Sequence, residues 1–228
     1  MELYLMRVII SAATKGEWMP LYQKINPKFV SPNKKFSVGF HESGIGMLAS
    51  SVSLMKLIAQ ETPSLIIQMG IAGSLDTKIQ LGKVYSIKNE VIGDLGVTEH
   101  KQWKDLFDLK LDKANAVPFE KKSLPNTWLK QYNLLKLPAK NGVTVNTITT
   151  DKKIAERYRV KYHADLESME GAALHYIGRD LNIPFLQIRS VSNYIGERNK
   201  AKWKLQEAIY NLNEAVFNYI EALSKHPL

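Results

Sequence analysis

The sequence of 228 residues contains no cysteine, which excludes a disulfide framework, a thiolate nucleophile and a cysteine-ligated zinc site. It also lacks any apolar run near the roughly 20 residues that a membrane-spanning helix needs. Its start shows no basic segment followed by an apolar run and a small-residue cleavage site. We therefore expect a cytoplasmic protein that folds by packing alone and has no membrane partner.

Acidic residues are in deficit, because 31 Lys and Arg stand against 22 Asp and Glu, giving a formal charge of +9. A basic protein of this kind could bind nucleic acid, an anionic surface or an acidic small substrate, and composition does not distinguish these partners. The basic residues are densest from 101 to 140, yet they lack the glycine and aromatic spacing of an RNA-binding motif. We predict no nucleic-acid partner.

Several motifs of catalysis and cofactor binding are missing as well. The five histidines show no metal-ligand spacing, so we assign no metal. Neither a P-loop nor the dinucleotide-binding fingerprint is present. Ser43 and Ser74 do not stand in a Gly-x-Ser-x-Gly run, which disfavours a serine hydrolase.

What the sequence does have is an alternation of short apolar segments with amphipathic ones. Strands are expected at 5–10, 36–41, 65–69, 82–88, 143–148, 164–167 and 184–190, and helices around 17–21, at 47–60, from 152, at 170–180 and at 202–223. This order indicates a single α/β domain over residues 1–228 with a largely parallel or mixed sheet. The irregular, proline-punctuated stretch 101–140 is the place expected for a mobile cover or an oligomer surface.

Small and polar residues follow the predicted strands, at the edge where ligands bind in open α/β sheets. The glycines of 44–46 and 70–73 would let a backbone approach a ligand closely, although tight turns without a ligand are the alternative. These segments are expected to converge in one site, together with 12–17, Asn146, Met169 with Glu170, and Ser192 with Asn193.

Glu170 begins a predicted helix and is followed by the small residues Gly171, Ala172 and Ala173. These residues leave room beside its carboxylate, which as a two-oxygen acceptor suits a cis-diol such as the ribose 2′,3′ pair. A favourable charge at the helix N-terminus is the alternative explanation.

Asn193 ends an apolar strand, where an exposed amide needs a partner, although Asn also favours simple turns. Arg189 lies earlier on the same strand. Because arginine is almost never buried unpaired, we expect it to pair with a carboxylate, in a role that is either structural or part of the site.

Together these motifs resemble the superfamily of purine nucleoside phosphorylases and nucleosidases. The resemblance extends from about residue 8 to residue 223 and implies a three-layer α/β/α sandwich with a mixed, barrel-like central sheet. It also implies a homodimer or higher homo-oligomer and no cofactor. The motifs that carry it are Ser43-Gly44-Ile45-Gly46, Gly70-Ile71-Ala72-Gly73, Glu167-Ser168-Met169-Glu170-Gly171-Ala172-Ala173 and Arg189-Ser190-Val191-Ser192-Asn193.

The resemblance further implies roles for single residues. Glu170 would hold the ribose hydroxyls, Met169 would pack on the sugar, and Asn193 would contact the purine. Glu17 matches, with a one-residue difference in spacing, the glutamate that activates water in the nucleosidases. Further substrate-binding positions are expected at Gly70, Ile71, Ala72, Gly73, Ser192, Asn146 and Arg189.

Hydrolysis is favoured over phosphorolysis by two positions. The hexameric phosphorylases of this superfamily hold phosphate with an arginine before the second glycine motif and a Ser or Thr within it, and an arginine does so as a bidentate fork. The positions are occupied here by Gln68 and Ile71. Water is therefore the expected nucleophile.

The amide of Asn193 decides the expected substrate. In the related methylthioadenosine/S-adenosylhomocysteine nucleosidases the matching residue is Asp, whereas an amide NH2 suits the O6 and N7 acceptors of a 6-oxopurine. Tyr194, Arg198-Asn199, Trp203 and the run Gly93-Asp94-Leu95-Gly96 add a similarity to the futalosine hydrolase subfamily.

We therefore predict release of hypoxanthine and dehypoxanthine futalosine from futalosine, a small purine nucleoside of menaquinone biosynthesis. The alternatives are a nucleosidase of the methylthioadenosine type, a purine nucleoside phosphorylase, and a nucleoside- or nucleic-acid-binding protein without catalysis.

Overall fold

The computed structural model describes residues 6–29 and 36–225, with only the backbone given for residues 26–29. Within these ranges no helix is long and apolar enough to cross a membrane. Leu5, where the first expected strand begins, lies outside the described residues.

The central sheet closes on itself. Strand β3 (Leu65–Ser74) pairs with both β9 (Leu166–Ser168) and β10 (Phe185–Tyr194). The ring is completed by β4 (Val84–Ile92), which pairs with β10, and by β8 (Ala139–Thr144), which pairs with both β4 and β9. These strands form a closed, barrel-like ring.

Three further strands extend the ring. Strands β1 (Met6–Ala12) and β2 (Phe36–Glu42) continue the sheet beyond β3 with parallel pairing, and β7 (Leu124–Pro125) pairs antiparallel with β4. Because β10–β4 and β3–β9 are antiparallel while the other ring pairs are parallel, the sheet is mixed. The mixed, barrel-like sheet implied by the resemblance is confirmed.

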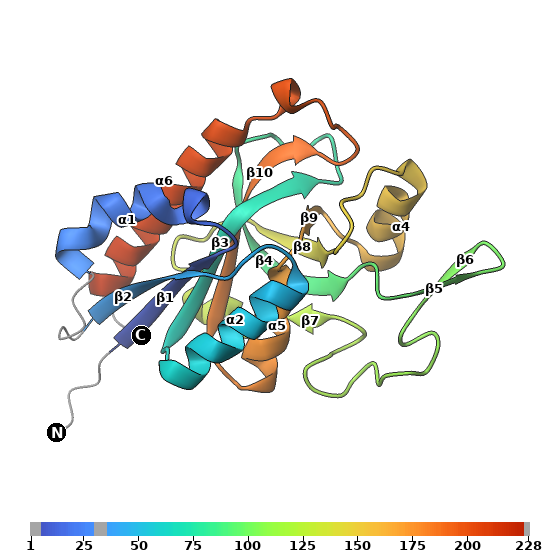
Figure 1. The fold of residues 1–228 in the computed structure, drawn as a ribbon, viewed down its shortest axis with the longest axis horizontal. Helices are drawn as coiled ribbons and strands as arrows, with labels where there is room; N and C mark the ends of the chain where they lie inside the picture. The colour runs from blue at the N-terminus through green and yellow to red at the C-terminus, as the bar shows by residue number, and fades with distance from the viewer. Residues whose placement is uncertain (1–5, 30–35, 226–228) are drawn as a thin grey trace.

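Helices cover the sheet in two pairs (Figure 1). Helix α1 (Lys15–Phe29) packs beside α6 (Leu205–Lys225), and α2 (Met47–Gln60) packs beside α5 (Gly171–Asp180). Consecutive residues of β3 show that the pairs lie on opposite faces, because successive strand side chains alternate. Ile67 belongs to the cluster with α1 and α6, whereas Ile66 packs with Leu54 and Leu174 of α2 and α5. The result is the expected three-layer α/β/α sandwich.

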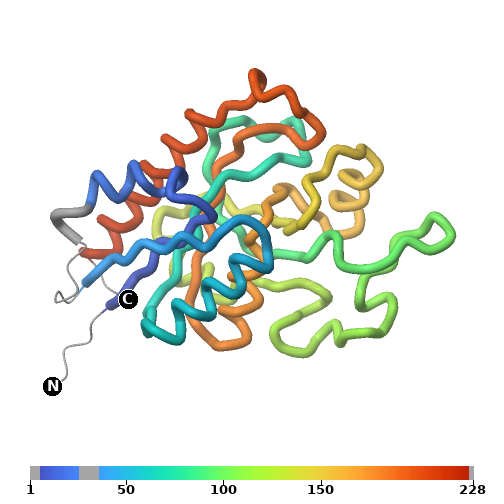
Figure 2. Tube along the Cα trace, in the orientation of Figure 1, coloured from blue at the N-terminus to red at the C-terminus, as the bar shows by residue number. Residues whose placement is uncertain are grey.

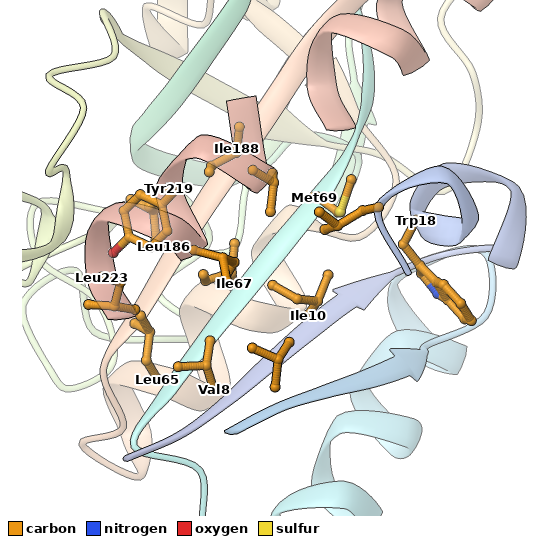
Figure 3. Close-up of a cluster of buried hydrophobic side chains, with 14 of the residues drawn as sticks. Val8, Ile10, Trp18, Leu65, Ile67, Met69, Leu186, Ile188, Tyr219 and Leu223 are labelled. Atoms are coloured by element: carbon orange, nitrogen blue, oxygen red, sulfur yellow. The ribbon is translucent and has the colours of Figure 1, made fainter. Parts of the chain in front are cut away.

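The larger hydrophobic cluster lies between the sheet and α6. Figure 3 shows Val8, Ile67 and Leu186 from neighbouring strands, facing Tyr219 and Leu223 of α6. Each of these side chains is fully buried. Burial of one such side chain stabilises the fold by about 1.5–3 kcal/mol, so this cluster fixes the sheet against the helix that bounds the candidate site.

The stretch 101–140 is more ordered than its composition predicts. Strands β5 (Gly96–Glu99) and β6 (Gln102–Asp105) form a hairpin that extends from the body of the protein as an arm (Figure 2), and the short helix α3 (Leu129–Tyr132) follows β7. The remaining elements are helix α4 (Lys152–Tyr162), whose first turn is capped by Asp151, and the 3-10 turn η1 (Lys200–Lys202).

Several predicted strand ends are wrong, and two of them affect the candidate site. Strand β3 does not stop at Gly70 but continues to Ser74, because residues 70–73 pair with residues 189–193 of β10. Strand β8 ends at Thr144 instead of continuing to 148. Beyond it, the N–H of Asn146 donates to Asp94 Oδ2 at 2.6 Å, which draws the chain out of the ladder.

Candidate active site

A cavity of about 400 Å³ lies where the carboxyl ends of β1, β3, β9 and β10 meet. It is bounded on one side by the start of α1 and on another by the segment leading into α6. Its lining residues are Ala13, Thr14, Gly16, Glu17, Ile45, Ile71, Ala72, Gly73, Ile148, Glu167, Ser168, Met169, Glu170, Ser192, Asn193, Ile195, Arg198, Trp203, Leu205 and Ile209.

Glu17 reaches this cavity from the first turn of α1. Its Oε1 accepts a hydrogen bond from the N–H of Ile71 at 3.1 Å, and its Oε2 accepts one from the N–H of Thr14 at 3.2 Å. Burial raises the pKa of Glu17 above its ordinary value, while the charge of Arg189 and the hydrogen bonds act in the opposite direction. A fixed carboxylate with a raised pKa is suited to accept a proton.

Glu170 stands at the junction of β9 and α5, yet its side chain does not cap its own helix. Its Oε1 instead accepts a hydrogen bond at 3.0 Å from the N–H of Gly46, and this glycine has a φ of +89° that side chains rarely adopt. The carboxylate is thus held across the cavity by the first glycine motif. Glu170 is also the N-cap residue of α5, so its charge is favourable at this helix end as well.

Arg189 lies directly beneath the cavity and is 2% exposed. Its Nη2 donates to Gln68 Oε1 at 2.9 Å and is 3.9 Å from Glu170 Oε2. The expected carboxylate partner of Arg189 is therefore Glu170. Gly70 makes this arrangement possible, since a Cβ there would lie 2.1 Å from Arg189 Nη1.

Asn193 is aimed into the cavity by a bulge in β10. Ser192 Oγ donates to Asn193 Oδ1 at 2.8 Å, and Asn193 Nδ2 donates to the carbonyl of Tyr194 at 3.1 Å. These bonds fix the amide orientation and leave one hydrogen of the NH2 group for a ligand. Asn193 can therefore act as a hydrogen-bond donor in the cavity.

The structure brings together most of the residues expected at the site. Gly70 and Arg189 lie immediately below the cavity wall rather than in it. Asn146 is separate: it lines a second hollow between α2 and α5, because the chain leaves β8 after Thr144. The expected residues that do line the cavity are Glu17, Ile71, Ala72, Gly73, Met169, Glu170, Ser192 and Asn193.

Some lining residues were not assigned to the site by the sequence reasoning. Glu167 and Arg198 are the charged residues among them, and for Glu167 the signal available in the sequence was a carboxylate inside a short strand. Ile148, Ile195 and Ile209 gave none, because apolar residues of a cavity wall look like core residues. Within 6–29 and 36–225, no group of three or more His, Cys, Asp or Glu could hold a metal ion.

The stretch 101–140 contributes no residue to the cavity lining. Part of it packs at α5 instead, where Arg179 Nη1 donates to the carbonyl of Pro125 at 3.0 Å. The expectation of a cover over the site is therefore not supported by where the stretch lies.

Comparison with known proteins identifies the family of the chain. The family model described as the phosphorylase superfamily matches residues 8–225. The chain is 28% identical over 171 residues to futalosine hydrolase of Thermus thermophilus, covering 74% of each chain. It is 26% identical over 190 residues to 5′-methylthioadenosine/S-adenosylhomocysteine nucleosidase of Staphylococcus haemolyticus, covering 81% of this chain and 79% of the relative.

A solved structure shares the fold. The nucleosidase of the same name from Helicobacter pylori, with butyl-thio-DADMe-Immucillin-A, superimposes with a TM-score of 0.77 at 15% identity. The superposition covers 96% of this chain and 100% of that one.

Proposed function

The chain belongs to the phosphorylase superfamily, and we propose that within it the protein is a nucleosidase that hydrolyses futalosine to hypoxanthine and dehypoxanthine futalosine, a step of menaquinone biosynthesis. The observation that carries this proposal is the fixed donor amide of Asn193 in a cavity that also holds two carboxylates, Glu17 and Glu170.

Water is the proposed nucleophile because the two positions expected to hold phosphate, Gln68 and Ile71, are unsuited to it. Gln68, at the position expected to hold a phosphate-binding arginine, is engaged with Arg189 and donates through Nε2 to the carbonyl of Glu170 at 3.3 Å. Ile71 has no hydroxyl, and its N–H already donates to Glu17. A phosphate dianion at this place would meet a carboxylate.

In the proposed reaction, Glu17 takes a proton from a water molecule as its oxygen attacks C1′ of the ribose. The C1′–N9 bond breaks, its electron pair leaves with the base, and the base takes up a proton from solvent to become hypoxanthine. Glu170 accepts hydrogen bonds from the ribose hydroxyls, and Met169 packs on the sugar. The NH2 group of Asn193 stabilises the negative charge that grows on the departing purine.

The same amide supports hypoxanthine as the base. N7 and O6 of a 6-oxopurine are both acceptors, whereas a 6-aminopurine presents an acceptor and a donor along that edge. Because Ser192 orients the amide, the free NH2 hydrogen of Asn193 offers the base a donor without needing a proton from solvent. Hypoxanthine therefore fits this amide better than adenine.

Two further residues of the cavity wall support a substrate with an acidic aromatic group. Arg198 and Trp203 both line the cavity, and the guanidinium carbon lies 5.7 Å from the indole ring centroid. Trp203 is fixed by its Nε1, which donates to the carbonyl of Glu197 at 3.0 Å. A cation beside a fixed aromatic surface suits the benzoate that futalosine carries.

We also propose that the protein assembles as a homodimer or higher homo-oligomer through α2 and α5. The second hollow, of about 750 Å³, lies between these helices. Leu48, Val52 and Met55 on its wall are 77%, 47% and 45% exposed, and clustered exposed apolar side chains mark interaction surfaces.

The proposal is tested by chromatography of the products formed from futalosine, methylthioadenosine and inosine, each with and without phosphate. Hypoxanthine released from futalosine at a rate indifferent to phosphate would support it. Adenine released from methylthioadenosine at a matching rate would favour the methylthioadenosine-type function, whose members are also similar to this chain. No released base would favour a binding protein.

A further inference from the structure

Glu90 is a buried carboxyl group that the proposed reaction does not use. It lies on β4, against the start of α5, and is 1% exposed. Two glycines make room for it. A Cβ on Gly142 would lie 2.2 Å from Glu90 Oε1, and a Cβ on Gly171 would lie 2.1 Å from the same atom. Because Gly171 directly follows Glu170, its missing side chain admits a second carboxyl group beside the one assigned to the ribose.

One oxygen of Glu90 is tied to the backbone of α5. Thr144 Oγ1 donates to Glu90 Oε2 at 3.1 Å and accepts from the N–H of Ala172 at 2.7 Å. Ala172 lies in the first turn of α5, two residues after Glu170. Through Thr144, Glu90 therefore supports the backbone from which Glu170 projects.

The other oxygen of Glu90 leads to two polar atoms without partners. Gln187 Nε2 donates to Glu90 Oε1 at 3.0 Å, and the Gln187 amide lies beside His175. His175 Nδ1 is 2.7 Å from the carbonyl of Leu124, so it carries the hydrogen of that bond. Burial lowers the pKa of His175 to about 3, which leaves its Nε2 with a lone pair and no hydrogen. Among the residues described, neither His175 Nε2 nor Gln187 Oε1 has a hydrogen-bond partner.

A half-turn of the Gln187 amide pairs these atoms. The turn exchanges the amide oxygen and nitrogen and keeps the shape of the side chain. Nε2 then donates to His175 Nε2, while Oε1 faces Glu90 Oε1, and a bond between these two oxygens requires a hydrogen on Glu90. Since buried polar atoms are nearly always paired, the complete set of bonds favours a protonated Glu90. Burial acts in the same direction and raises the pKa of Glu90 from 4.5 to about 7.

The charge of Arg189 gives this proton a consequence for the cavity. Arg189 Nη2 lies 3.9 Å from Glu170 Oε2, and its positive charge also interacts with Glu17 and with Glu90. His175 of α5, the titratable group beyond Gln187, is neutral. If Glu90 were ionised, three buried carboxylates would share one guanidinium, and buried charge without compensation is costly.

We infer that Glu90 carries a proton in the active protein and is a positioning residue, because its neutral state leaves the charge of Arg189 to Glu170 and Glu17. The inference rests on the proposed nucleosidase function of this cavity. When Glu90 loses its proton, the new negative charge attracts Arg189 and weakens its hold on Glu170, the carboxylate assigned to the ribose. Activity should therefore fall as Glu90 ionises.

Glu90→Gln separates this role from a merely structural one, because the amide copies the shape and hydrogen bonds of the neutral acid. Its oxygen accepts from Thr144, and its NH2 group donates to Gln187 Oε1 in the turned orientation. The measurement is kcat/KM for futalosine from pH 6 to pH 9. We expect the wild-type value to fall by about tenfold or more above pH 7, the effect of weakening one buried charge pair. The variant should keep its pH 6 value across the range.

Two further variants complete the series. Glu90→Leu removes the hydrogen bonds along with the charge and should be less active at every pH. Glu156→Gln changes an exposed carboxylate on α4 and, as the matched control, should show the wild-type profile. A wild-type rate that does not fall, a fall that persists unchanged in Glu90→Gln, or a Glu90→Gln protein that is folded but much less active at pH 6 would each overturn the inference.

Spectroscopy supplies a readout that needs no turnover. At pH 6 the infrared spectrum should contain the C=O stretch of a buried carboxylic acid that is absent in Glu90→Gln, and the ¹⁵N resonances of His175 should be those of a neutral ring. An ionised Glu90 beside a cationic His175 would overturn the inference. If the protein shows the buried acid but cleaves no nucleoside, the proposed function fails, and calorimetric binding of futalosine at pH 6 and pH 9 tests the positioning role. Its affinity should fall with pH in the wild-type protein and not in Glu90→Gln, and an equal fall in both would contradict that role.

Discussion

The backbone N–H of Ile71 donates to Glu17 Oε1 at 3.1 Å, which ties the carboxylate after β1 to the glycine motif at the end of β3. An N–H group of such a motif is a ready donor for an anion, and here a carboxylate of the protein already occupies it. The same contact therefore positions a proton acceptor, and it occupies a backbone N–H that could otherwise donate a hydrogen bond to phosphate. This relationship underlies the proposal that water, not phosphate, attacks the substrate.

Glu17→Gln tests the proton acceptor. The amide keeps an oxygen for the N–H of Ile71 but cannot take a proton from water, so kcat should fall by about 10²- to 10⁴-fold with little change in KM. Steady-state rates of hypoxanthine release measure this, with Glu42→Gln as a control at a more exposed carboxylate. A variant with near-normal kcat would remove Glu17 from this role.

The pH dependence of kcat/KM should report the titration of Glu17. Glu17 acts in its ionised form, and burial raises its pKa above the ordinary value of 4.5. The value of kcat/KM for futalosine should therefore decline as pH falls through a midpoint above 4.5, and Glu17→Gln should lack this limb. An acid limb that persists unchanged in the variant would assign the titration to another group.

Asn193→Asp tests the donor to the base. An aspartate donates only when protonated, so the variant should lose activity on futalosine as pH rises, whereas the wild-type amide does not titrate. We expect kcat to fall by about 10-fold or more at neutral pH, the loss of one bond to a developing charge. Parallel pH profiles of the two proteins above neutrality would argue against the proposed role of Asn193.

A buried carboxyl below α5 predicts how stability depends on pH. Glu90 accepts hydrogen bonds from Gln187 Nε2 at 3.0 Å and Thr144 Oγ1 at 3.1 Å, and Thr144 Oγ1 in turn accepts from the N–H of Ala172 at 2.7 Å. Burial raises the pKa of Glu90 from 4.5 to about 7. The folded protein thus holds this proton more tightly than the unfolded chain does.

The free energy of unfolding should therefore fall as pH rises from 4.5 to about 7, by up to about 3 kcal/mol from this group. Glu90→Gln removes the titrating group, so its free energy of unfolding should change less between pH 5 and pH 8 than that of the wild-type protein. Urea unfolding at the two values measures it. A variant whose stability falls between them as steeply as that of the wild-type protein would contradict the assignment.

Leu48→Glu tests the proposed assembly through α2 and α5. A charge at this 77% exposed position should weaken association and shift the mass in sedimentation equilibrium toward the monomer. Leu111→Glu is the control, because Leu111 is 72% exposed and does not line the hollow between these helices. Identical masses for both variants and the wild-type protein would place the interface elsewhere.

The sequence predicted those parts of the fold that local spacing controls. The helix over 47–60 has the bounds expected from its apolar spacing and from Pro63. The rule that ligands bind at strand ends placed Glu17, Glu170 and Asn193 in one cavity. These residues could be found because each lies near the end of a strand that the sequence marks clearly.

The rest depends on contacts between segments that are distant in the chain. Gly70 and Gly73 were expected in a loop, but they lie inside β3, where their missing side chains admit Arg189 and Ile195. Asn146 was expected at the site and is held away from it by Asp94. Glu167 was overlooked because only the pairing of β3 with β9 and β10 brings it opposite Asn193.

The central claim is that water attacks the N-glycosidic bond of a 6-oxopurine nucleoside, and one incubation tests it most directly. Futalosine is incubated with the protein in ¹⁸O-labelled water that also contains phosphate, and the masses of the products are measured by mass spectrometry. The account predicts hypoxanthine together with a sugar product that carries one solvent oxygen at C1′. An unlabelled sugar 1-phosphate, or intact futalosine, would contradict it.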